Sequence, residues 1–154
     1  DDNYTLVNYP TDIWEGLAIL NKVAPIYVNT QYLSIVDIFG DPNSRINQIY
    51  MLNNLCFVNV HFSYDLTNNG QNIIETLGYI EKMVDKNSYI IIGGDMNGTP
   101  NQISGPFEEA GYLDCWEVTN SGSLGYTFSS DKPNERIDFL WTNVPKDKIK
   151  SMKI

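Results

Sequence analysis

The stretch IIIGGDMNGTP, residues 90–100, runs from an apolar segment straight into a carboxylate and an amide. Tyr89–Ile92 has the length and composition of a strand that is buried on both faces. Gly93-Gly94 permits close backbone approach or a positive φ. Asp95 and Asn97 follow where the strand ends, which is where layered α/β folds place functional side chains. The stretch therefore predicts a central strand and a candidate site at its carboxyl end.

Apolar runs and turn residues predict a sheet with helices between its strands. Strands are expected over 16–20, 31–39, 46–52, 55–62, 89–92 and 136–141, and another from Ile149 onward. Asn53-Asn54 between two of these runs predicts a hairpin. Apolar residues at helical spacing predict a helix over 69–85, in which Ile74 and Met83 widen the apolar stripe. A short helix over 106–110 ends at Gly111. This pattern indicates an α/β layered domain built on a central sheet.

The bulk composition limits the function classes. The chain has 154 residues, 42% of them hydrophobic, which suits one globular domain. No apolar run approaches the roughly 18 residues of a membrane-spanning helix. A net charge of −9 disfavours non-specific binding to nucleic-acid backbones. Four lysines near the end are either a solvated edge or a phosphate-facing patch: Lys146, Lys148, Lys150 and Lys153.

The run from Leu55 to His61 carries two candidates. Side chains alternate along a strand, so Asn59 and His61 share a face with Leu55 and Phe57, and that face becomes polar toward the strand's end. His61 is the only histidine in the chain. It is either a hydrogen-bonded structural imidazole or a residue that contacts the substrate.

Asp95 and Asn97 have two interpretations. In the first, they form an Asx-turn that ties the loop to its own backbone. In the second, Asp95 accepts a proton from water and the Asn97 amide holds that water or an oxyanion.

A third group lies in the last quarter of the chain. Arg136 and Asp138 point the same way along a strand and could form a plain salt bridge. A carboxylate entering an apolar strand requires a partner if it is buried. Thr127 lies between two aromatic residues, and it either belongs to a packed strand or joins the site.

Four motifs in this order resemble the endonuclease/exonuclease/phosphatase superfamily, the DNase I-like fold. They are Asn59-Val60-His61, Gly94-Asp95-Met96-Asn97, Thr127-Phe128 and Arg136-Ile137-Asp138-Phe139. The segment from Trp14 to Leu20 is similar to one that these enzymes carry on an earlier strand. The resemblance implies a layered β-sandwich flanked by helices and a metal-dependent phosphoesterase.

The resemblance also implies roles for catalytic residues. Asp95 would orient and deprotonate the attacking water, and Asn97 would hold that water or a phosphoryl oxygen. His61 would donate to the phosphate, and Asp138 would orient a second histidine. Asp95 and Asn97 would also be ligands of Mg²⁺ or Mn²⁺.

Three further residues are implied as substrate contacts: Asn59, Thr127 and Arg136. The implied substrate is a phosphoester, whether a small phosphoester, a lipid headgroup or nucleic acid. The acidic composition favours the first two over duplex DNA.

The family's metal-binding Gln-Glu segment and its closing Ser-Asp-His motif have no counterpart in these 154 residues. Glu15 does not have the sequence context of the metal-binding glutamate. We therefore expect an incomplete domain, about the last two-thirds, with weak metal binding and little turnover by itself. The alternative is a non-catalytic member that acts as a binding module.

Overall fold

The computed structural model of the protein describes residues 5–10 and 16–154. The strands are β1 (Thr5–Pro10), β2 (Gly16–Asn21), β3 (Tyr27–Leu33), β4 (Arg45–Leu52), β5 (Leu55–His61), β6 (Tyr89–Asp95), β7 (Leu113–Asp114) and β8 (Asp138–Thr142). The helices are α1 (Leu66–Met83), α2 (Pro100–Glu109), α3 (Cys115–Thr119) and the 3₁₀ turn η1 (Lys146–Lys148). Glu15 and Trp14 lie outside the described residues.

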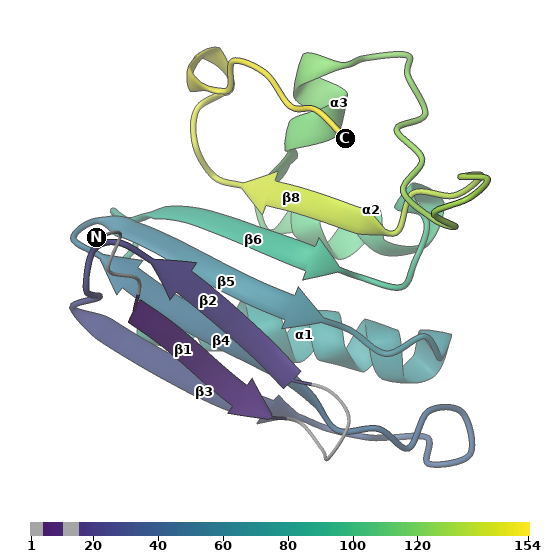
Figure 1. Cartoon of the computed structure of the whole chain (residues 1–154), viewed down its shortest axis with the longest axis horizontal. Coiled ribbons are helices and arrows are strands. Elements are labelled where there is room, and N and C mark those ends of the chain that lie inside the picture. The colour runs from purple at the N-terminus through teal and green to yellow at the C-terminus, as the bar shows by residue number, and fades with distance from the viewer. Residues whose placement is uncertain (1–4, 11–15) are drawn as a thin grey trace.

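A six-stranded mixed sheet organises the fold, in the order β3-β4-β5-β6-β8-β7. β5 and β6 run parallel and the other neighbours run antiparallel. The antiparallel pair β1–β2 lies over one face of this sheet, while α1 lies on the other face (Figure 1). The expected α/β layered architecture, with two sheets facing each other and helices outside, is confirmed.

The helix-covered face of the sheet is the main core. Its side chains on the three central strands are at most 7% exposed: Cys56, Val58, Val60, Ile90, Ile92, Phe139 and Trp141. Ile73 and Ile80 of α1 belong to the same core cluster, and Phe107 of α2 stacks on Trp141 with ring centroids 4.8 Å apart. The predicted alternation along β5 is confirmed, because every second residue points into this core.

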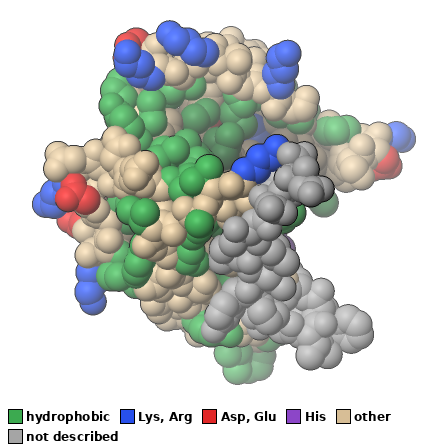
Figure 2. Space-filling view, turned by 60° about the vertical axis from the view of Figure 1, so that its left-hand side comes forward, with side chains coloured by type: hydrophobic (Ala, Val, Ile, Leu, Met, Phe, Trp, Pro, Cys, Tyr) green, Lys and Arg blue, Asp and Glu red, His purple; other side chains and the backbone are tan. Residues whose placement is uncertain are grey.

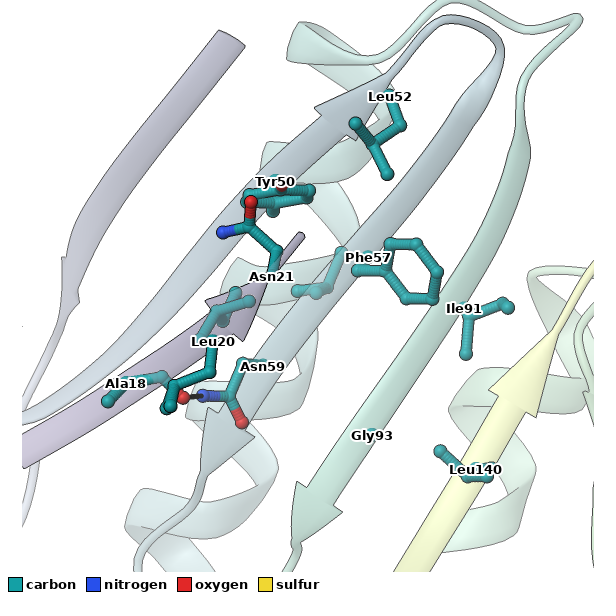
Figure 3. A pocket seen from close by; sticks show the side chains of 12 residues that line it. Ala18, Leu20, Asn21, Tyr50, Leu52, Phe57, Asn59, Ile91, Gly93 and Leu140 are labelled. Atoms are coloured by element: carbon teal, nitrogen blue, oxygen red, sulfur yellow. Dashed lines mark hydrogen bonds between the residues drawn. The ribbon is translucent and has the colours of Figure 1, made fainter. Parts of the chain in front are cut away.

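The opposite face is only partly covered. An apolar hollow of about 470 Å³ lies between β2 and the central strands, lined by residues that include Leu20, Phe57, Ile91 and Leu140. Figure 3 shows these side chains converging from β2, β5, β6 and β8. Hydrophobic side chains also gather on the molecular surface in the space-filling view (Figure 2). This face therefore lacks the close packing of the helix-covered face.

Several expected elements were confirmed and several were wrong in their bounds. The β4–β5 hairpin is confirmed, with Asn53 at a φ of 50°. The strand expected over 31–39 is instead β3, which ends at Leu33. The amides of Val36 and Asp37 donate to the side chain of Asn68 rather than to a neighbouring strand. Residues 149–154 form no strand.

The helix boundaries also differ from expectation. α1 begins at Leu66 because the Asp65 carboxylate accepts from the amides of Thr67 and Asn68, which caps the helix. Ile74 is 61% exposed, so it does not widen the buried stripe. The short helix begins at Pro100 rather than 106, because Thr99 and Gln102 form a capping box there.

The bounds of the last strand also differ from expectation, whereas the helices agree with the absence of a long apolar run. The strand expected over 136–141 begins two residues later, at Asp138, and continues to Thr142. Within residues 5–10 and 16–154, the helices are too short or too polar to span a bilayer.

Candidate active site

Three of the predicted site residues lie in one row across the sheet. The pairing register places His61 opposite Asp95 and Asp95 opposite Asp138, on β5, β6 and β8. Side chains at paired positions point to the same face of a sheet, here the face that carries the apolar hollow. The two rows before it are apolar or mixed: Phe57–Ile91–Thr142, then Asn59–Gly93–Leu140. The face thus changes from apolar to ionisable at the strand ends.

The Asp95 carboxylate has two different oxygen environments. Its Oδ1 accepts from the backbone amide of Asn97 at 2.9 Å, which is an Asx-turn. Its Oδ2 lies 3.8 Å from Nε2 of His61, which is too long for a direct hydrogen bond. Both side chains are about one-third exposed, at 33% for His61 and 34% for Asp95. Asp95 thus forms the Asx-turn and still has a partly exposed carboxylate.

Burial is the main cause that raises the pKa of Asp95 above its ordinary value. The nearby Asp138 carboxylate acts in the same direction, because two close negative charges disfavour each other. The Asn97 amide, His61 and Arg45 oppose this rise. A partly desolvated carboxylate beside a second one is an arrangement typical of functional sites.

Asn97 adopts a left-handed backbone with a φ of 46°. This conformation is uncommon for residues other than glycine, but Asn tolerates it better than most. Its Nδ2 donates to the carbonyl of Phe62 at 2.9 Å, so its side chain joins the loops that follow β5 and β6. Asn97 is therefore held beside the row through both its backbone and its amide.

Thr127 supports the Asp138 end of the row. Its Oγ1 accepts from the amides of Ile137 at 3.2 Å and Asp138 at 3.3 Å. The hydroxyl thus holds the start of β8, and with it the Asp138 carboxylate. Thr127 is brought to the site, where its visible contacts are with backbone.

Arg136 and Asn59 have internal partners instead. The Arg136 side chain is 2% exposed and pairs with Asp114 at 2.7 Å and Glu117 at 3.0 Å, so it ties α3 to the start of β8. Asn59 donates to the carbonyl of Ala18 at 3.3 Å, as drawn in Figure 3, and to Gln48 at 3.2 Å. The contact with Ala18 joins the two sheets, whereas the contact with Gln48 lies within the six-stranded sheet. These contacts of Arg136 and Asn59 are with other parts of the protein rather than with the row.

Sequence reasoning missed the buried polar groups behind the row. Asp41 accepts from Arg45 at 2.9 Å and from the Ser63 hydroxyl at 2.7 Å. Three α1 asparagines, each at most 2% exposed, bind the loops around the site: Asn68, Asn69 and Asn72. Asn69 lies four residues before Ile73, on the buried stripe of the helix, and this spacing was the available signal.

The donors at the row are hard oxygens. No group of three His, Cys, Asp or Glu side chains suited to a metal occurs among residues 5–10 and 16–154. Asp95, Asp138 and the Asn97 amide still offer the carboxylate and amide oxygens with which Mg²⁺ binds while it keeps much of its water. The Asp138 carboxylate adds to the effect of burial in raising the pKa of Asp95, and a cation nearby would offset this repulsion. The donor set fits Mg²⁺ or Mn²⁺ as a partial site.

Comparison with solved structures identifies known proteins that share this fold. Truncated TDP2 from Caenorhabditis elegans superposes with a TM-score of 0.71 at 15% identity, over 92% of this chain and 62% of that chain. The mannosyl-6-phosphatase Bt3783 of Bacteroides thetaiotaomicron gives 0.68 at 15% identity, over 90% and 62% respectively. The chain thus spans less than two-thirds of the length of these structures.

The amino-acid sequence was also compared with curated proteins and with family profiles. A search of curated protein sequences found no match. Residues 2–147 match the sequence profile of the Endonuclease/Exonuclease/phosphatase family. This match covers nearly the whole chain. It agrees with the fold and with the four motifs, which lie on or beside the adjacent strands β5, β6 and β8. The chain belongs to the Endonuclease/Exonuclease/phosphatase family.

Proposed function

We propose that this chain carries the water-activating part of a metal-dependent phosphoesterase active site. The observation that carries the proposal is the row of His61, Asp95 and Asp138 at the ends of three adjacent strands. A base, a proton donor and a second carboxylate on one face are the groups that attack of water on phosphorus requires.

Asp95 is the general base. Its Oδ1 is fixed by the Asn97 amide, so the carboxylate cannot rotate freely and Oδ2 stays on the side of His61. Burial raises the pKa of Asp95 and thereby makes the ionised carboxylate a better proton acceptor. The proton of the attacking water passes to Oδ2 as the water oxygen bonds to phosphorus. The ester P–O bond opposite the water breaks, and the leaving alkoxide takes a proton from solvent water.

His61 and Asn97 stabilise the phosphoryl oxygens. His61 Nε2 lies on the same side as Asp95 Oδ2, where an N–H can donate to an oxygen that gains negative charge. Asn97 is held by its left-handed backbone and its bond to Phe62, so its amide costs little to orient during the reaction. Asp138 faces Asp95 across the β6–β8 pair, and Thr127 fixes its backbone.

Asp95 and Asn97, with Asp138 opposite, would hold the Mg²⁺ or Mn²⁺ ion. When bound, the ion supplies charge neutralisation at the phosphoryl oxygens. For the substrate, the net charge of −9 favours a small phosphoester or a lipid headgroup over duplex DNA. The likeness to a structure named as a mannosyl-6-phosphatase is compatible with the small phosphoester.

The alternative is a binding module without turnover. It is favoured by the lack of a third acidic or histidine ligand within the described residues. The two functions differ in whether a phosphoester is cleaved or only bound, so one assay with two readouts separates them.

The test uses the protein expressed from its complete reading frame. Hydrolysis of bis(p-nitrophenyl) phosphate and p-nitrophenyl phosphate is measured with Mg²⁺, with Mn²⁺ and with EDTA. We expect metal-dependent turnover that falls at least about 10²-fold in Asp95→Asn. Asp147→Asn is the matched control, because it makes the same change at a carboxylate that is 73% exposed on η1.

Each outcome decides between the functions. Asp95→Asn with wild-type turnover would remove Asp95 from the role of base. Absence of turnover with both substrates, together with saturable binding of p-nitrophenyl phosphate, would establish the binding module instead.

A further inference from the structure

We infer that Asn69 is a positioning residue that fixes the distance between His61 and Asp95 by joining the two loops that follow their strands. The inference rests on the proposed function for its catalytic consequence, but not for its structural content. Asn69 has no part in the four motifs that indicate the site.

The contacts of the Asn69 amide carry the inference. Its Nδ2 donates to the carbonyl of Ser63 at 2.7 Å and to the carbonyl of Met96 at 2.6 Å. Ser63 lies two residues after His61, and Met96 directly follows Asp95. One side-chain nitrogen therefore binds the exits of β5 and β6 at the same time.

Other hydrogen bonds join the same two loops directly. The Phe62 amide donates to the carbonyl of Asp95 at 3.0 Å, and Asn97 Nδ2 donates to the carbonyl of Phe62 at 2.9 Å. These bonds run from one loop to the other, whereas Asn69 comes from α1, a third element packed into the core. A junction held from a rigid third element resists sliding as well as separation.

The burial of Asn69 indicates why an amide is required there. Asn69 is 2% exposed and lies on the buried stripe of α1 with Ile73, Thr76 and Ile80. An apolar side chain would suit this stripe, because burying an amide is unfavourable unless its hydrogen bonds are made. A donor at this position satisfies two carbonyls that an apolar side chain would leave without it.

Small errors of position are costly in catalysis. The Asp95 Oδ2 to His61 Nε2 separation is 3.8 Å, and both atoms must face the same phosphoryl group in the proposed reaction. A displacement of about 1 Å in such a site reduces turnover by about 10²-fold. Asn69 acts on this separation through backbone atoms and touches neither side chain.

The experiment compares Asn69→Leu and Asn69→Asp with Ile80→Ala in the protein from its complete reading frame. Asn69→Asp keeps the shape and volume of asparagine and loses the donor. Asn69→Leu also loses the donor and replaces the amide with a larger apolar side chain. Ile80→Ala is a destabilising control in the same helix at the same 2% exposure, away from the loops. The imidazole Cε1–H signal of His61 in the proton NMR spectrum is assigned by its disappearance in His61→Gln.

We expect the His61 Cε1–H and Asn97 amide resonances to move in both Asn69 variants and to stay in place in Ile80→Ala. In the active protein, kcat should fall at least about tenfold in the Asn69 variants while KM changes less than about twofold. Lower thermal stability with unmoved His61 and Asn97 resonances would overturn the inference, because Asn69 would then be a structural residue only.

Two other results are possible: the Asn69 variants do not fold, or the wild type shows no turnover. If neither Asn69 variant folds, couplings through hydrogen bonds from Asn69 Nδ2 to the carbonyl carbons of Ser63 and Met96 are measured in the wild type. Absence of either coupling overturns the inference, and presence of both supports it. If the wild type shows no turnover, the proposed function fails, while the resonances still decide the role of Asn69.

Discussion

The two faces of the central sheet are built from alternate residues of the same strands, yet they differ in packing. The face under α1 and α2 is closed, with Ile92 at 0% and Trp141 at 1% exposure. The face under β2 carries the apolar hollow and ends in the His61–Asp95–Asp138 row. The closely packed core thus lies on one face and the candidate site on the other, so neighbouring residues should respond differently to the same substitution.

The largest difference is expected between two adjacent glycines of β6. A Cβ at Gly94 would stand 1.9 Å from the carbonyl oxygen of Val60, at a φ of +142°, so Gly94→Ala cannot be accommodated. A Cβ at Gly93 would clash with the flexible tip of Leu140 at 2.5 Å and would lie at an ordinary contact distance, 3.5 Å, from the carbonyl oxygen of Phe139. We expect Gly94→Ala to cost more than about 4 kcal/mol and Gly93→Ala less than about 1 kcal/mol in free energy of unfolding.

Urea unfolding followed by circular dichroism measures both glycine variants. Equal losses of unfolding free energy in the two variants would show that the hollow face is packed as tightly as the helix-covered face, and would contradict the expected difference.

A smaller difference is expected between two adjacent isoleucines. Ile92 is fully buried in the helix-covered core, so Ile92→Ala should cost about 2–5 kcal/mol through lost burial and an unfilled cavity. Ile91 lines the hollow, where space already exists, so Ile91→Ala should cost about 1 kcal/mol. Midpoints of urea unfolding at equal slope check this. If Ile91→Ala lost as much unfolding free energy as Ile92→Ala, the hollow would be filled in solution.

The smallest effect concerns pH at the end of the hollow face. Burial raises the pKa of Asp95 above its ordinary value of 3.8, so ionisation is less favourable in the folded state than in the unfolded state. Stability present below pH 3.8 is lost as the pH rises through the folded-state pKa. Asp95→Asn, which keeps an oxygen for the Asn97 amide, should therefore stabilise the protein at pH 7 by under about 1 kcal/mol.

Thermal unfolding in EDTA over pH 3 to 8 measures this gain. The gain should vanish at the acid end, where Asp95 is protonated in both states. A gain that stays constant with pH would assign the stabilisation to packing rather than to charge.

The sequence predicted much of this local organisation because its signals are local. Tyr89–Ile92 ending at two glycines predicted the central strand, and Asn53-Asn54 predicted the hairpin. Alternation along Leu55–His61 correctly separated the core side from the candidate side. Helix starts were less accurate, because capping by Asp65 and Thr99 depends on side-chain bonds that a periodicity does not contain.

The candidate site was partly predictable. His61, Asp95 and Asp138 were identified by residue type and order, but their alignment in one row depends on strand register between distant segments. Arg136 was expected at substrate, yet its side chain is buried against Asp114 and Glu117, partners about twenty residues away. A charge pattern in sequence cannot tell which of several acidic residues folds against an arginine.

By itself, then, the sequence determined the strands, the main helix, the polar strand ends and the family resemblance, because apolar periodicity and motif order are written residue by residue. Only the tertiary structure decided which strands are neighbours, that one face is closed and the other open, and that Asn69 joins two distant loops. The physical reason is that burial and hydrogen-bond partners are properties of the packed chain, since a side chain's environment is set by residues far from it in sequence.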